Sequence, residues 1–327
     1  MNISVIGSGS WGIALSIYLA KKGNNIKVWS FDEEEKRKIN EEKKCIFLPG
    51  IDLPNGIFCT NNYEEALKDT EVILHVTPSK FTRNTIKSYR NFVKPNQILI
   101  MCSKGFEPET NFMMNEIIEQ ELPNIRYGIL SGPSHAEEVA IGIPTALVIA
   151  SRDDFVKKEI VDLFKSEILR MYYSNDIEGV EIGGALKNII AFCAGAAVGL
   201  NFGDNTFAML ATRGLVEITR LGLAMGGDKN TFYGLTGLGD LIVTCGSKHS
   251  RNRRAGELIS KGYSIEEARK EIGMTIESID NIDSAYCLAK KYNIEMPIVE
   301  TVYNVLYNGL EPKEAVKILM TRNLKSE

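Results

Sequence analysis

The residues with the clearest capacity for chemistry lie in the second half of the chain, around one lysine. Lys187 stands in "EIGGALKNIIAFCAGAAVGL", residues 181–200, which is otherwise almost wholly small and apolar. The stripe that Lys187 occupies at helical spacing holds five glycines and alanines: Gly183, Gly184, Ala191, Ala194 and Gly195. Such neighbours leave space around the amine. Two interpretations remain open: a long stem that carries its ammonium out to water, or a reactive amine that gives and takes a proton.

A second group of reactive residues lies in "TGLGDLIVTCGSKHSRNRRAG", residues 236–256, whose glycines are expected to form turns. Ser250 is typical of a helix N-cap, and backbone N–H groups, the Arg251 guanidinium and the Asn252 amide would then converge on a phosphate oxygen. The alternative is that the arginines are solvated helix charges. Asp240 is expected either to orient a lysine or a substrate hydroxyl, or to cap a helix.

The start of the chain carries a pattern for binding a dinucleotide. In "ISVIGSGSWG", Gly7, Gly9 and Gly12 follow an apolar run and lead into a helical pattern. Gly7 would allow a tight turn, Gly9 would let a pyrophosphate approach the backbone, and Gly12 would allow close helix packing. The alternative is three turn glycines without a ligand.

The residues after the second predicted strand bear on the choice of cofactor. "FDEEE", residues 31–35, offers no arginine for a 2′-phosphate, and its carboxylates could accept from a 2′-hydroxyl. The pattern therefore favours NAD over NADP. The same acidic run is also consistent with the solvated first turn of a helix.

Two further predicted strands end in residues suited to a binding crevice. "EVILHV" runs into Thr77-Pro78-Ser79, and "ILIMC" runs into Ser103-Lys104-Gly105. Since the carboxyl ends of strands in an open α/β sheet border the ligand, we expect Lys104 to meet an anionic substrate or the nicotinamide. A surface lysine in a turn is the alternative.

These residues must be positioned by two kinds of architecture. Short apolar runs alternate with amphipathic ones in the first half, which predicts a doubly wound parallel sheet, and the second half shows only helical patterns. We therefore predict an α/β Rossmann-like dinucleotide-binding domain over 1–178 and an all-α domain over 179–327. The predicted strands are 2–7, 26–30, 56–60, 71–76, 97–103, 126–131, 145–151 and 170–174. The long predicted helices are 176–200, 204–226, 250–260, 264–271, 279–291, 297–308 and 311–321.

Composition excludes several classes of protein. With 327 residues, a formal net charge of −4 and 44% hydrophobic residues, the chain is long enough for two domains and gives no case for nucleic acid. The six cysteines and three histidines show no metal-ligand spacing, so we expect reduced thiols and no metal. The apolar run 189–200 is shorter than the roughly 20 residues of a membrane span, and we expect a cytoplasmic protein.

Taken together, the motifs resemble those of the NAD(P)-dependent glycerol-3-phosphate dehydrogenase family, in the family's order and over essentially the whole chain. The quoted stretches are "GSGSWG" (7–12), "FLPGIDLP" (47–54), "VTPS" (76–79), "SKG" (103–105), "SGPSHAEEVA" (131–140), "GGALKN" (183–188), "GLTGLGDLIVTC" (234–245), "SRNR" (250–253) and "GMTIES" (273–278). The resemblance implies a fold like that of 6-phosphogluconate dehydrogenase and the reversible reduction of dihydroxyacetone phosphate to sn-glycerol 3-phosphate, which feeds glycerophospholipid synthesis.

The resemblance also implies roles for individual residues. Lys187 would be the proton donor and acceptor, with Lys104 and Asp240 also in the catalytic group. Residues that would surround the phosphorylated substrate are Lys104, Gly132, Ser134, Lys187, Asp240, Ser250, Arg251 and Asn252. Residues that would contact NAD or NADP are Gly7, Gly9, Ser10, Trp11, Gly12, Phe31, Lys104, Ala136, Arg251 and Glu277.

The chain departs from the family pattern at three places. Phe31 stands where many bacterial relatives have an arginine, "IES" at 276–278 replaces a commoner "VEG", and His75 occupies a position that is often small. The first departure favours NAD. No role for His75 follows from the sequence, nor does the net direction of the reaction or any feedback control, and a homodimer is expected from fold analogy only.

Two other functions are compatible with the residues alone. A hydroxy-acid or imine dehydrogenase would share the dinucleotide turn and a helix lysine, but would not require the "SRNR" cluster. A dinucleotide sensor that binds a partner protein would need neither Lys187 nor Asp240.

Overall fold

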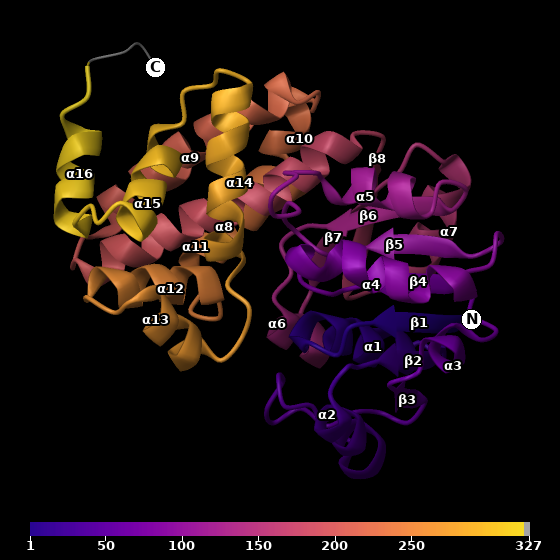
Figure 1. Ribbon diagram of the computed structural model, residues 1–327. Helices are drawn as coiled ribbons and strands as arrows, with labels where there is room; N and C mark the ends of the chain where they lie inside the picture. Colours follow the sequence, from indigo (N-terminus) through magenta and orange to yellow (C-terminus); the bar gives the residue numbers. More distant parts are fainter. Residues whose placement is uncertain (324–327) are drawn as a thin grey trace. The chain divides into compact units, whose positions relative to one another are not determined.

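The computed structural model describes residues 1–323, and the chain divides into two units (Figure 1). Unit 1 comprises Met1–Glu107 and Phe112–Glu181, and unit 2 comprises Pro108–Asn111 and Ile182–Glu327. The division of roles between domains 1–178 and 179–327 stays a prediction, and residues 324–327 of the second lie outside the described part of the chain.

Unit 1 is built on one sheet, in which all the predicted strands are found. Among the described residues it has eight strands in the order β3-β2-β1-β4-β5-β6-β7-β8. Neighbouring strands are parallel except β6 and β7, which pair antiparallel, so the prediction of a parallel sheet is wrong at that one junction. The strands are β1 (Asn2–Ile6), β2 (Asn25–Trp29), β3 (Ile57–Thr60), β4 (Val72–His75), β5 (Ile98–Met101), β6 (Arg126–Ser131), β7 (Thr145–Ala150) and β8 (Leu169–Ser174).

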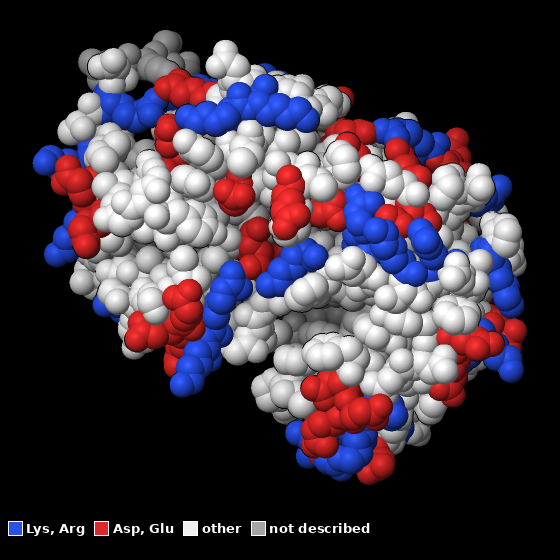
Figure 2. All heavy atoms as spheres, in the orientation of Figure 1, with Lys and Arg blue, Asp and Glu red and all other residues white. Residues whose placement is uncertain are grey.

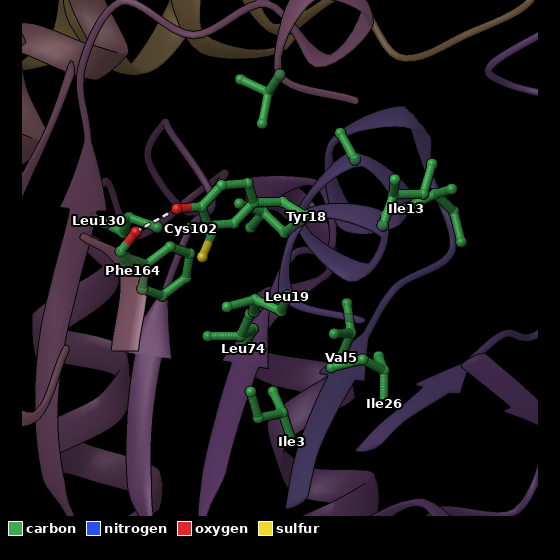
Figure 3. Packing of buried hydrophobic residues seen from close by; sticks show 14 of the residues in the cluster. Ile3, Val5, Ile13, Tyr18, Leu19, Ile26, Leu74, Cys102, Leu130 and Phe164 are labelled. Carbon is green, nitrogen blue, oxygen red and sulfur yellow. Dashed lines mark hydrogen bonds between the residues drawn. The ribbon is translucent and has the colours of Figure 1, made fainter. Parts of the chain in front are cut away.

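Buried side chains fasten the first helix to this sheet. Figure 3 shows Ile13, Tyr18 and Leu19 of α1 beside strand residues such as Val5 and Leu74, and all of them are buried. The Tyr18 hydroxyl donates to the carbonyl of Phe164 at the end of α7. The helices of unit 1 are α1 (Ser10–Lys21), α2 (Glu33–Arg37), α3 (Tyr63–Leu67), α4 (Thr82–Tyr89), α5 (Met114–Glu121), α6 (Ala136–Ile141) and α7 (Asp154–Phe164).

Unit 2 is helical, and α8 runs into it from unit 1. The described part of unit 2 matches each long helix predicted from the sequence to within about two residues. Its helices are α8 (Ile177–Gly199), α9 (Asp204–Ala224), α10 (Lys229–Tyr233), α11 (Asp240–Gly246), α12 (Arg251–Ser260), α13 (Ile265–Ile272), α14 (Glu277–Lys291), α15 (Pro297–Tyr307) and α16 (Pro312–Met320).

The glycine-rich segment before α12 differs from the prediction. We expected turns there, but a π-helical turn over Leu235–Gly239 leads directly into α11. Gly237 makes this possible, because a Cβ at that position would lie 2.1 Å from the Phe232 carbonyl oxygen. The local glycine content suggested turns, whereas the glycines permit tight packing of short helices.

Small residues bring α8 and α12 into backbone contact. A Cβ on Gly195 would lie 1.7 Å from the Arg253 carbonyl oxygen, and one on Gly256 would lie 1.9 Å from the Phe192 carbonyl oxygen. These distances exclude any side chain at either position. The glycines therefore fix how closely the two helices approach.

The apolar composition of α8 reflects burial. It is the one helix within residues 1–323 long and apolar enough to cross a membrane, with a mean hydropathy of 1.5 over 18 residues. However, 78% of that stretch is buried inside the protein, which is typical of a core helix. The apolar run 189–200 is therefore only part of a longer apolar helix, and burial accounts for the composition of that helix.

A buried carboxylate joins α9 to α15. Glu217 is 3% exposed and accepts from the backbone N–H groups of Ile298 and Val299, in the first turn of α15. These N–H groups have no partner within the helix, so the carboxylate completes its N-terminus. Burial raises the pKa of Glu217 to about 7.

Candidate active site

The structure places Lys187 in a buried polar group of unit 2. The side chain is 6% exposed, and Nζ donates to Asp240 Oδ1 at 2.5 Å and to Thr244 Oγ1 at 2.7 Å. Of the two interpretations, the stem that carries its ammonium out to water is therefore excluded. A buried ammonium is tolerated here because a carboxylate and a hydroxyl bind it.

Asp240 is hydrogen-bonded to Lys187, the contact that an orienting role would need. It is the first residue of α11 and is 1% exposed. The Thr244 hydroxyl, one turn later, donates to the Asp240 backbone carbonyl at 2.6 Å while it accepts from Lys187. One helix turn thus presents both partners of the amine. Sequence reasoning missed Thr244, although a hydroxyl four residues after Asp240 was a detectable signal.

Two of the small residues around Lys187 lie against the backbone of other helices. We predicted that they leave space around the amine, but a Cβ on Gly183 would lie 2.9 Å from the Thr236 carbonyl oxygen. Gly195 likewise contacts the backbone of α12. Gly183 and Gly195 therefore accommodate neighbouring backbone.

The predicted phosphate cluster lies at the start of α12. Ser250 is confirmed as the N-cap, since its side chain accepts from the Arg253 backbone N–H. Arg251 Nη1 donates to the Thr275 carbonyl at 3.0 Å. Asn252 Nδ2 donates to Asn188 Oδ1 at 2.9 Å, and its Oδ1 accepts from the Ser278 backbone N–H at 2.8 Å. The structure thus brings together "SRNR", "GGALKN" and "GMTIES".

Glu277 begins α14, close to the carbonyl that Arg251 binds. Its Oε2 accepts from Asn281 Nδ2 at 3.0 Å, and its side chain is half-buried. The replacement of "VEG" by "IES" therefore puts a buried serine at 278, whose backbone N–H holds Asn252.

The glycine turn of unit 1 has the geometry that a dinucleotide requires. Gly7 has φ +123°, and a Cβ on Gly12 would lie 2.2 Å from the Gly7 carbonyl oxygen. At Gly9 no atom of the described residues lies within 4 Å of the Cβ position. Gly9 is the N-cap of α1 and supplies no side-chain cap, so the N–H groups of the first turn face an open approach. Ser10 and Trp11 are the first two residues of that helix.

The acidic run after β2 forms the N-cap and first turn of α2. Asp32 is the N-cap of α2 and accepts from the Glu35 backbone N–H, and Glu35 is buried with a raised pKa caused by that burial. Glu33 pairs with Lys36, and Figure 2 shows acidic and basic side chains interspersed over α2. Phe31 precedes the cap and is 82% exposed.

The carboxyl ends of β5 and β6 bring a third group together. Lys104 Nζ donates to the Gly132 carbonyl at 3.2 Å, and the Ser134 hydroxyl donates to the same oxygen at 3.0 Å. Gly132 has φ +135°, and a Cβ there would lie 3.0 Å from the Ala146 carbonyl oxygen. Ala136 follows at the first position of α6. Lys104 is therefore hydrogen-bonded to the turn that follows β6.

His75 is a core residue of β4. It is fully buried, with Nδ1 3.1 Å from the Tyr89 hydroxyl and Nε2 2.7 Å from the Thr77 hydroxyl. Burial lowers its pKa to about 3, so the imidazole is neutral.

Cysteines and acids give no sign of metal chemistry. All six cysteines lie within residues 1–323 and are free thiols. In that part of the chain no three His, Cys, Asp or Glu side chains form a group that could hold a metal ion.

Comparison with known proteins gives one family for both halves of the chain. The model of the NAD-dependent glycerol-3-phosphate dehydrogenase N-terminus matches residues 2–156, and that of the C-terminus matches residues 176–317. The chain is 51% identical to a glycerol-3-phosphate dehydrogenase (NAD(P)+) of Fusobacterium nucleatum subsp. nucleatum over 331 residues, which cover 100% of this chain and 98% of the relative. An enzyme of the same name from Agathobacter rectalis is 45% identical over 99% of this chain and 97% of its own length.

Solved structures agree with this result. The crystal structure of glycerol-3-phosphate dehydrogenase from Coxiella burnetii has a TM-score of 0.95 and 34% identity, and covers 98% of this chain and 99% of that one. A D-mandelate dehydrogenase in complex with NADH has a TM-score of 0.64 at 15% identity, over 94% of this chain and 98% of that one, which shows a shared fold alone.

Proposed function

The chain belongs to the NAD-dependent glycerol-3-phosphate dehydrogenase family, and from this premise we propose that it catalyses the reversible reduction of dihydroxyacetone phosphate to sn-glycerol 3-phosphate. The observation that carries the proposal beyond the family is the buried Lys187, held by Asp240 and Thr244. The product would feed glycerophospholipid synthesis, and the enzyme would work in the cytoplasm.

Unit 1 would hold the dinucleotide. The Gly9 approach and the first-turn N–H groups of α1 suit a pyrophosphate, and Ser10, Trp11 and Ala136 would contact the cofactor beside them. When bound, the nicotinamide supplies or accepts the hydride, which no side chain can do. Lys104 would meet the substrate or the nicotinamide, with Gly132 and Ser134 next to it.

Lys187 would be the proton donor and acceptor. In the direction of reduction, its ammonium donates a proton to the C2 oxygen of the substrate as negative charge develops on that oxygen. In the reverse direction the amine takes the proton back. Asp240 accepts from Nζ and compensates its charge, while Thr244 fixes the second N–H direction. The two partners thereby restrict the orientation in which the proton leaves.

The start of α12 would hold the phosphate. Ser250 and Asn252 build the turn through their bonds to Arg253, Asn188 and Ser278, and Arg251 supplies the charge. Arg251 and Glu277 would also contact the cofactor. They lie close together because Arg251 donates to the carbonyl of Thr275, two residues before Glu277.

NAD is proposed as the preferred cofactor, with NADP as a possible substitute. Phe31 provides an exposed ring in place of an arginine, and the Asp32 carboxylate would repel a 2′-phosphate even while it caps α2. We further propose a homodimer, from fold analogy.

The function is tested by following the absorbance of reduced nicotinamide with dihydroxyacetone phosphate, with NADH and NADPH in parallel. We expect oxidation that is faster with NADH, and a loss of turnover of about 10²–10⁴-fold in Lys187→Met. Lys261→Met, which removes an exposed lysine of the same unit, is the matched control and should keep full turnover. Absence of NADH and NADPH oxidation in the unchanged protein would overturn the proposal.

A further inference from the structure

A hydrogen-bonded row of side chains crosses the interior of unit 1 beneath two of its turns. It begins at the Tyr89 hydroxyl on α4, continues through the two nitrogens of His75, and reaches the Thr77 hydroxyl after β4. The Thr77 carbonyl then accepts from the Ser103 hydroxyl at 2.5 Å, after β5. Tyr89 and His75 are fully buried, and Thr77 and Ser103 are 8% and 9% exposed.

The two ends of this row have different surroundings. The Tyr89 end lies among aromatic side chains, with the Tyr63 ring centroid 5.9 Å from that of Tyr89. At the other end, the Val76–Thr77 peptide packs on Gly7, where a Cβ would lie 3.1 Å from the Val76 carbonyl carbon and 3.3 Å from the Thr77 nitrogen. That end therefore touches the glycine turn on one side and the residue before Lys104 on the other.

The imidazole suits a role in which it holds its neighbours in place. A neutral histidine has one donor and one acceptor nitrogen, and both find a hydroxyl partner here. The imidazole cannot rotate without the loss of a buried hydrogen bond. The Thr77 hydroxyl, and the turn that carries it, are fixed by the same constraint.

We propose that His75 is a positioning residue of the reaction, which acts through its Nε2 bond to Thr77 to fix the turn between the glycine loop and Ser103-Lys104. The inference rests on the proposed function, because it assumes that this turn borders the dinucleotide. It assigns a role to a residue for which the sequence offered none. The Nδ1 bond to Tyr89 serves stability only.

The two nitrogens can be separated by substitution. The amide of asparagine reaches the place of Nδ1, and the amide of glutamine reaches the place of Nε2. His75→Asn and Thr77→Val should therefore raise the Kd for NADH by about five- to tenfold, since each removes the bond that holds the turn. His75→Gln should stay within about twofold of the unchanged protein. Tyr89→Phe is the matched control, and it should lower Tm but leave the Kd unchanged.

Isothermal titration with NADH alone gives the Kd, and thermal unfolding gives the Tm of each variant. His75→Asn combined with Thr77→Val should bind no more weakly than either single variant, because both remove the same bond. If the unchanged protein binds NADH while His75→Asn and Thr77→Val bind as tightly, the inference is overturned and the proposed function stands. If the unchanged protein binds no NADH, both are overturned. Thr77→Val carries the test alone should His75→Asn fail to fold.

Discussion

Replacement of Asp240 by asparagine should destabilise the protein, although it changes one atom of the side chain. Lys187 is 6% exposed and Asp240 1% exposed, so the substitution leaves a buried ammonium without the negative charge of its carboxylate partner, although the asparagine oxygen can still accept from Nζ. Removal of one member of a buried ion pair costs about 3–5 kcal/mol in the free energy of unfolding. For a unit of this size the Tm should fall by on the order of 10 °C.

The double variant separates a lost interaction from an uncompensated charge. With Lys187→Met added to Asp240→Asn, neither charge of this pair remains, and about half or more of the lost stability should return. Thr244→Val serves as the neutral comparison and should cost about 2 kcal/mol, because it removes the hydrogen bond accepted from Lys187 and the one donated to the Asp240 carbonyl. Turnover should remain absent in the double variant, so recovery of stability and of activity can be told apart.

Urea unfolding followed by circular dichroism measures these differences, together with the Tm of each variant. The reasoning would be refuted by equal unfolding midpoints for the unchanged protein and Asp240→Asn. It would also be refuted if the double variant lost the sum of the two single losses, because the two side chains would then not be coupled.

Three further outcomes are expected. Gly12→Ala should unfold at a lower temperature because its Cβ would lie 2.2 Å from the Gly7 carbonyl oxygen, whereas Gly9→Ala should keep its Tm and bind NADH more weakly, as titration of both variants would show. The Glu217 carboxyl keeps its proton up to about pH 7 in the native state but only up to about pH 4.5 in the unfolded state. Its contribution to the free energy of unfolding is therefore full below pH 4.5 and falls by about 3 kcal/mol as the pH rises to 7. Glu217→Gln should remove that fall, and unfolding midpoints at pH 5 and pH 7.5 that change equally in both proteins would contradict it. Arg251→Met should raise KM for dihydroxyacetone phosphate by about tenfold or more but leave that for unphosphorylated dihydroxyacetone unchanged, and equal effects on both substrates would remove the phosphate role.

Much of the fold could be predicted from local patterns in the sequence. Every strand of the sheet was visible as a short apolar run, and Gly7, Gly9 and Gly12 could be placed because a strand and a helix flank them. Ser250 was recognisable as a helix cap because N-caps depend on residues close in sequence. Such features are decided within a few residues.

Features that depend on contacts between distant segments were not accessible. A continuous apolar strand pairs equally well in either direction, so the antiparallel junction of β6 and β7 leaves no mark on the sequence. Thr244, a partner of Lys187 that was not expected, stands 57 residues away, and the partners of His75 include Tyr89 on another element. The glycines beside Lys187 were visible, but only the structure shows that backbone of other helices lies against them.

The close approach of α8 and α12 affects which substrate lengths the enzyme accepts. The backbones of these helices touch where Gly195 contacts Arg253 and where Gly256 contacts Phe192. The two helices that meet there carry the proposed acid, Lys187, and the proposed phosphate ligand, Arg251. The span between carbonyl and phosphate that the enzyme accepts is therefore set where two main chains touch, at positions remote from any ligand atom. Libraries that vary only ligand-contacting side chains would leave this span as it is, and an enzyme for longer phosphorylated ketones would have to be sought by changing how α8 and α12 cross.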